Sequence, residues 1–118
     1  MFQSCESLKK INISNFSFDS TTILDNLFAD CFSLVEIKLP DFSYMKITAI
    51  SGIFRDCVSL IEVDMGTLNP KYIKFAGLAF DGCKNLRKCN IPKLSDTCNT
   101  YVMFRECNPD IIPSWYKK

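Results

Sequence analysis

The 118-residue sequence contains no histidine. Histidine is the usual general base of enzymes, the partner of serine and cysteine nucleophiles and the commonest zinc ligand. Its absence excludes these catalytic pairs and most zinc sites, although Asp, Glu, Lys, Tyr and Cys side chains could still take part in catalysis. We therefore expect no enzymatic activity, no catalytic residues, no cofactor and no metal.

The sequence also lacks an excess of charge of either sign and any long apolar run. Its 14 basic and 13 acidic residues give a net charge of +1, which offers no general attraction to nucleic acid or to anionic membranes. No apolar stretch approaches the length of a transmembrane helix, about 18 residues, and the first residues lack the basic and apolar regions of a secretory signal. We expect no nucleic-acid partner and no membrane insertion, and an intracellular location stays open.

What the sequence does contain is one pattern in four near-copies, Phe-x-x-Cys-x-x-Leu-x-x-(Ile/Val/Cys)-x-(Ile/Leu/Met). The copies begin at Phe2, Phe28, Phe54 and Phe80, each 26 residues after the last, and a broken fifth copy begins 24 residues later at Phe104. A fixed period with apolar anchors indicates repeats that bury their faces against their neighbours. It predicts one domain from 1 to 118, with repeats at 2–27, 28–53, 54–79 and 80–103 and a C-terminal cap at 104–118.

Each repeat combines two different apolar spacings. Leu24, Leu27, Phe28 and Cys31 lie at i, i+3, i+4 and i+7, which predicts a short helix over 24–31, and the spacing recurs over 50–57 and 76–83. Apolar and polar residues then alternate strictly over 36–39, as they do over 10–13, 62–65 and 88–91, which predicts short strands that stack in parallel. The predicted fold is α/β, with about four and a half repeats, parallel strands on one side and short helices on the other.

The run from Phe2 to Phe16 resembles the BspA-type leucine-rich repeat, including the variant common in mycoplasma and gut-bacterial surface proteins. The resemblance extends over residues 1–107. It implies a right-handed leucine-rich-repeat solenoid used for protein binding or adhesion, and it carries no catalytic residues. Because relatives are often displayed on cell surfaces, it also implies a cell-surface or extracellular location.

The outward-facing residues of the strands are the candidate partner-binding site. They form two columns on neighbouring repeats, where the flanking repeats hold the side chains in a rigid row. The residues are Lys10, Asn12, Glu36, Lys38, Glu62, Asp64, Lys88 and Asn90. The partner would be a protein or another macromolecule. In the alternative interpretation, the charges only pair across the strands and keep the sheet soluble.

Two further functions stay open on the residues alone. Glu36 and Glu62 would lie on adjacent strands about 5 Å apart, a spacing compatible with a retaining glycosidase, although no aromatic groove for sugar stacking is evident. The first repeat leaves the edge of the strand at 10–13 uncovered, and an open edge is a pairing template. The chain could then be a structural block of a surface layer or particle that self-associates through its N-terminal repeat.

The cysteines invite a disulfide or metal interpretation. The repeated column consists of Cys5, Cys31, Cys57, Cys83 and Cys107. On successive helices these residues would be separated by about 8–10 Å, which is too far for a disulfide. The sequence also contains no Cys-x-x-Cys motif, so we expect reduced thiols that act as small hydrophobes. Cys98, in the shortened last loop, is expected to be reachable by solvent.

Overall fold

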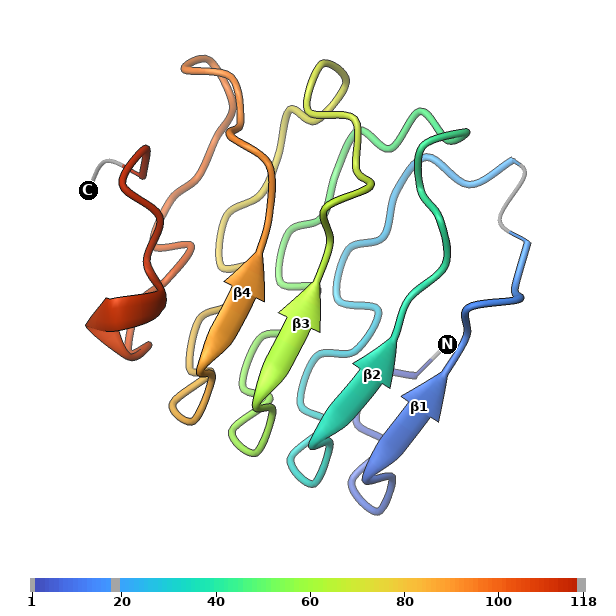
Figure 1. Cartoon of the computed structure of the whole chain (residues 1–118), viewed down its shortest axis with the longest axis vertical. Coiled ribbons are helices and arrows are strands. Elements are labelled where there is room, and N and C mark those ends of the chain that lie inside the picture. The colour runs from blue at the N-terminus through green and yellow to red at the C-terminus, as the bar shows by residue number, and fades with distance from the viewer. Residues whose placement is uncertain (1, 18–19, 117–118) are drawn as a thin grey trace.

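Four short parallel strands, one from each repeat, form a single sheet in the order β1-β2-β3-β4 (Figure 1). The computed structural model describes residues 2–17 and 20–116. The strands are β1 (Lys10–Asn12), β2 (Glu36–Lys38), β3 (Glu62–Asp64) and β4 (Lys88–Asn90). Each strand pairs with the next at the same repeat position, so that Ile11 faces Ile37 and Val63 faces Cys89. The predicted strands and their parallel stacking are confirmed.

The side of each repeat that precedes the strand contains β-turns, and the prediction of short helices there is wrong. The described residues contain no α-helix, and their one helical segment is the 3-10 turn η1 (Pro109–Ile111). Instead, the N–H of Leu27 donates to the carbonyl of Leu24, and Cys31 donates to Phe28, each over 3.3 Å. Asn26 and Asp30, the third residues of these turns, have φ of 58° and 62°, as type II turns require.

The reason for the failed helix prediction is that two consecutive four-residue turns reproduce the i, i+3, i+4, i+7 spacing of a helix. We call residues 24–31, 50–57, 76–83 and 100–107 the turn segments. In the first three of these segments, alternate N–H groups donate to the next repeat: Phe28 bonds to the carbonyl of Ile53 over 2.9 Å and Asp30 to that of Arg55 over 2.8 Å. An N–H used in this way cannot close an i→i−4 helical bond. We call this set of bonds between neighbouring turn segments the turn ladder.

The repeated phenylalanines stack into one continuous column inside the sheet and the turn segments. Phe28, Phe54 and Phe80 are 0% exposed, and neighbouring rings lie 5.3 to 5.8 Å apart, centroid to centroid. Leu34, Leu60 and Leu86 are equally buried. These contacts confirm that the repeat anchors share one apolar interior, and the burial of large aromatic rings is the main stabilising contribution expected for a small domain.

Residues 108–116 pack over the last turn segment. Asn108 Oδ1 accepts the N–H of Asp110 at 3.0 Å and starts η1. The ring of Tyr116 meets that of Phe104 edge-on at 5.0 Å, and its hydroxyl bonds to the carbonyl of Thr100 and the N–H of Met103. Tyr116 therefore closes the phenylalanine column. Residues 117–118, the lysine tail of the predicted cap, lie outside the described residues, as do residues 1 and 18–19.

The cysteine column makes hydrogen bonds that the sequence analysis did not predict. The thiol of Cys57 donates to the carbonyl of Phe28 at 3.1 Å, and Cys31, Cys83 and Cys107 bond in the same way to the phenylalanine of the preceding repeat. The expected separation of helices is wrong, because the turn segments are directly hydrogen-bonded to one another. All seven cysteines are nevertheless free thiols.

Cys98 is not the accessible thiol that we expected. Its exposed fraction is 9%, and it belongs to the apolar core. The shortened loop folds inward and places Cys98 beside Leu94 and Trp115 at the end of the domain. Burial raises the pKa of this thiol, so it is a poor nucleophile near neutral pH.

Candidate interaction surface

The eight residues that the sequence analysis selected lie on one exposed face, which we call the strand face. All eight are exposed, and the residue between them in β1, β2 and β3 is buried. Pairing of the strands places Lys10, Glu36, Glu62 and Lys88 in one column. Asn12 faces Lys38 and Asp64 faces Asn90 in the other column. The strand alternation in the sequence thus located this face correctly.

In the C-terminal half of the strand face, side chains contact one another. Lys88 Nζ lies 3.8 Å from Glu62 Oε1, with both side chains more than half exposed. Asp64 Oδ1 accepts hydrogen bonds from Asn90 Nδ2 at 3.0 Å and from the N–H of Gly66 at 2.9 Å. An exposed pair such as Lys88–Glu62 stabilises a fold by only about 0–1 kcal/mol, but these contacts hold the side chains in place.

In the N-terminal half, the charged side chains are free of such contacts. Within the part of the chain that the structure describes, Lys10, Glu36 and Lys38 form no side-chain ion pair or hydrogen bond. Asn12 bonds only to Ser14, two residues along the chain. Pairing across the strands therefore accounts for Lys88 and Glu62 but leaves three charged groups available to a partner.

A hollow of about 460 Å³ lies at the C-terminal end of the strand face. Its floor includes Val63 and Cys89, and Asp110 and Ile111 of η1 line one side. The 3-10 turn η1 lies beside β4 in Figure 1. Four strand-face residues line it, together with Arg87: Glu62, Asp64, Lys88 and Asn90. Burial raises the pKa of Cys89 to about 12, so the thiol in the floor is neutral near pH 7. The hollow offers a partner both charge signs around a small apolar floor.

Two of the residues around the hollow were missed by the sequence analysis. Arg87 comes directly before β4, and Asp110 belongs to the cap. The alternation in the strand could not find them, because both lie outside it. The position of Asp110 depends on how the cap folds against β4, which is a tertiary contact.

A charge cluster on the turn side was also missed. Asp81 is 4% exposed and accepts two hydrogen bonds from Arg105, at 3.0 and 2.9 Å, while Arg55 Nε lies 3.9 Å away. The bond to Asp81 raises the pKa of Arg105, which keeps it charged. The sequence did contain a signal for this cluster, because all three charged residues directly follow a repeat phenylalanine and therefore occupy the same position in successive repeats. The fully bonded geometry indicates a structural role.

The glycosidase alternative gains no support from this geometry. Glu36 and Glu62 are register partners on β2 and β3, as predicted. Glu62, however, lies beside Lys88 and lines the hollow, which Glu36 does not. The two carboxylates therefore do not face one shared cavity in which a sugar could lie between them.

Comparison with known protein families identifies a family with the same kind of repeat. The model of the BspA-type leucine-rich repeat region, with six copies, matches residues 1–111. The chain belongs to this family. Leucine-rich repeats of this kind are generally non-enzymatic interaction modules and are often surface-associated. No curated protein and no solved structure matches this BspA-type chain. Residues 2–17 and 20–116 include no helix that is long and apolar enough to cross a bilayer.

Proposed function

We propose that this BspA-type chain is a non-enzymatic module that binds another protein through its strand face. The observation that carries the proposal is the row of charged side chains, Lys10, Glu36 and Lys38, that have no partner among the described residues. Display at the cell surface and adhesion belong to the same proposal, as does a right-handed winding of the repeats into a solenoid.

The strand face has the rigidity that such a role needs. The turn ladder and the stacked phenylalanines hold each strand at a fixed position relative to the next. A backbone that is fixed in advance in this way loses little freedom on binding, which favours affinity. One column of the strand face consists of Lys10, Glu36, Glu62 and Lys88, with the two acidic residues in the middle, so the expected partner presents a complementary pattern with basic groups in the middle.

The experiment that tests the proposal is capture of partners by the immobilised chain, followed by mass spectrometry and affinity measurement. Lys38→Glu reverses one free charge on the strand face and should weaken binding of a captured partner about tenfold, or about 1.4 kcal/mol. The matched control is Lys74→Glu, the same change at an exposed lysine outside the strands. Equal affinity of the two variants would contradict the proposal.

A structural block that assembles through its N-terminal repeat is the second candidate. β1 lies at one edge of the sheet, and Leu8 beside it is 38% exposed. In this case the chain should self-associate in analytical ultracentrifugation, Lys38→Glu should leave the association unchanged, and Leu8→Glu should abolish it. A monomer at all concentrations would exclude assembly and leave the strand-face proposal in place.

A further inference from the structure

Two positions of the repeat carry apolar side chains in the middle repeats and charged side chains in the outer ones. They are the first and the fourth residue after the repeated cysteine. In the second and third repeats these residues, which we call the apolar edge, are Phe32, Val35, Val58 and Ile61. In the first and fourth repeats they are Glu6, Lys9, Lys84 and Arg87. Phe32, Val35 and Ile61 are 42%, 39% and 41% exposed.

The fold does not require apolar residues at these two positions. The N–H of Leu34 donates to the carbonyl of Cys31 over 3.2 Å, and the same bond recurs in the other three repeats. Lys84 and Arg87 are exposed on this same turn, so the backbone accepts a charge at both positions. Neighbouring apolar side chains that are exposed without being needed by the fold indicate a contact with another molecule.

Hydrogen bonds hold the residues at the fourth position in one row. The N–H of Val35 donates to the carbonyl of Lys9 over 2.8 Å, that of Ile61 to Val35 over 3.2 Å, and that of Arg87 to Ile61 over 2.7 Å. Val35 and Ile61 are therefore neighbours, with a basic residue on either side. The loops that carry them precede β2 and β3, at the lower edge of the molecule in Figure 1.

The charges beside the apolar edge differ between its two ends. In the first repeat, Glu6 and Lys9 have opposite charges. In the fourth repeat, Lys84 and Arg87 are both basic, and neither forms an ion pair within the described residues. A complementary partner therefore places apolar groups on the middle repeats and acidic groups on the fourth.

A second copy of the chain and an anionic membrane both fit this pattern poorly. Two copies related by a two-fold axis through the apolar edge would bring Lys9 and Arg87 against like charges of the partner. An anionic membrane would meet Glu36 and Glu62, the exposed acidic residues that directly follow the fourth position in the middle repeats. A protein can avoid both conflicts, because its acidic groups can be confined to one end.

The spacing of the repeats matches the pitch of an α-helix. Neighbouring rings of the phenylalanine column lie 5.3 to 5.8 Å apart, and one helical turn rises about 5.4 Å. A helix laid across the repeats thus presents one turn to each repeat. In a strand, the side chains of one face are about 6.6–6.8 Å apart and would not keep this register.

We propose that the apolar edge binds an amphipathic α-helix of a partner protein, with acidic side chains placed next to Lys84 and Arg87. Apolar residues at i, i+3 and i+4 would meet the second and third repeats, and acidic residues at i+7 and i+8 would meet the fourth. The apolar edge lies beside the strand face but contains none of its eight residues. The inference is therefore independent of binding through the strand face.

The test uses a labelled, end-blocked helical peptide built on this pattern. Leucine stands at i, i+3 and i+4, glutamate at i+7 and i+8, and alanine and glutamine fill the other positions. We expect saturable binding to the full chain by fluorescence anisotropy. Ile61→Gln should weaken binding at least about tenfold, because it removes apolar contact. Ile23→Gln, at an isoleucine that is 58% exposed outside the apolar edge, should leave the affinity unchanged.

A charge exchange tests the placement of the acidic residues. Lys84→Glu should weaken binding of the peptide about tenfold, whereas Lys74→Glu, the same change at an exposed lysine elsewhere, should not. A peptide with lysine at i+7 and i+8 should bind Lys84→Glu better than it binds the original chain. Circular dichroism should first show that every variant is folded.

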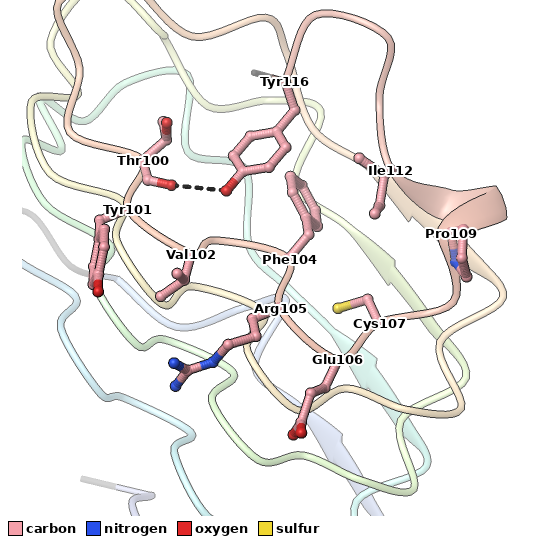
Figure 2. Close-up of a pocket in the computed structure, with 10 residues that line it drawn as sticks. All are labelled: Thr100, Tyr101, Val102, Phe104, Arg105, Glu106, Cys107, Pro109, Ile112 and Tyr116. Atoms are coloured by element: carbon pink, nitrogen blue, oxygen red, sulfur yellow. Dashed lines mark hydrogen bonds between the residues drawn. The ribbon is translucent and has the colours of Figure 1, made fainter. Parts of the chain in front are cut away.

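An apolar cleft of about 540 Å³ beside the cap is a competing site for such a peptide (Figure 2). Phe104 and Tyr116 line it, and Arg105 in its wall already forms an ion pair. The cleft shares no residue with the apolar edge. A peptide held there would bind Ile61→Gln and Lys84→Glu as well as it binds the original chain.

Three outcomes would overturn the inference. They are no saturable binding of the peptide to the folded chain, equal affinity of Ile61→Gln and Ile23→Gln for the peptide, and binding of the chain to phosphatidylserine vesicles or to itself through Ile61. Lys38→Glu should leave binding of the peptide unchanged, because Lys38 lies at the other end of β2. Failure at the apolar edge and failure at the strand face are therefore separate results.

Discussion

On both sides of each repeat, the backbone forms hydrogen bonds with the neighbouring repeats, but the side chains of the two sides differ in burial. On the strand side, the neighbouring strands bond to each other, and only the middle residue of a strand points inward. On the turn side, neighbouring segments also bond to each other, yet Phe28, Ala29 and Cys31 are all at most 2% exposed. The comparison shows that the turn side carries most of the apolar packing, while the strand side is left free to display polar groups.

The largest expected effect comes from the phenylalanine column. Phe54→Ala removes a ring that is 0% exposed and stacks on both Phe28 and Phe80, so it should lower the free energy of unfolding by about 3–5 kcal/mol. Phe75→Ala, at a ring that is 53% exposed, should cost less than about 1 kcal/mol. Urea denaturation of both variants measures the difference, and similar losses would contradict the described core.

A second test concerns the turns themselves. Gly52 has φ of 63°, and a Cβ there would collide with Asn26 Oδ1 of the neighbouring repeat. Gly52→Ala should therefore destabilise the fold by about 1–3 kcal/mol. Gly77→Ala is the matched control, because its φ is not positive and its added Cβ would make only ordinary contacts. If this segment were helical, Gly52→Ala would stabilise the protein instead.

The pH dependence of stability tests the buried thiols. Burial raises the pKa of Cys57 from its usual value of 9.0 to about 12. Between pH 9 and pH 12 the thiol of Cys57 is ionised in the unfolded chain but stays protonated in the folded chain. The stabilisation of the fold by this thiol is therefore complete below pH 9 and is lost as pH rises toward 12. By pH 10 the expected loss is about 1 kcal/mol. Cys57→Ala should flatten the fall in the unfolding midpoint between pH 8 and 10, and an unchanged slope would contradict this assignment.

The smallest effect is expected on the strand face. Glu62→Gln removes the exposed contact with Lys88 and should change the free energy of unfolding by less than about 1 kcal/mol. In high salt, the difference in free energy of unfolding between Glu62→Gln and the original chain should disappear, because salt screens exposed ion pairs. A larger loss in thermal or chemical unfolding would mean that this face stabilises the fold, and the division between the two sides would then fail.

The strand side of the fold could be predicted from the sequence and the turn side could not, for a physical reason. Alternation over 36–39 is compatible with one local structure, a half-buried strand, and the strand face followed from it. The spacing of Leu24, Leu27, Phe28 and Cys31 is compatible with two structures, a helix and consecutive turns. Gly52, Gly82 and Asn26 were a usable signal, because these residue types tolerate positive φ and recur at the same two places of the turn segments.

The sequence by itself determined the period, the apolar column and the exposed row on the strands, because each depends on residue types at fixed spacing. Only the tertiary structure decided that Phe28 and Asp30 send their N–H groups to Ile53 and Arg55 rather than along their own segment. It also placed η1 beside the hollow. A backbone donor has the same chemistry in every residue, so the partner it takes is set by which chain segment lies next to it.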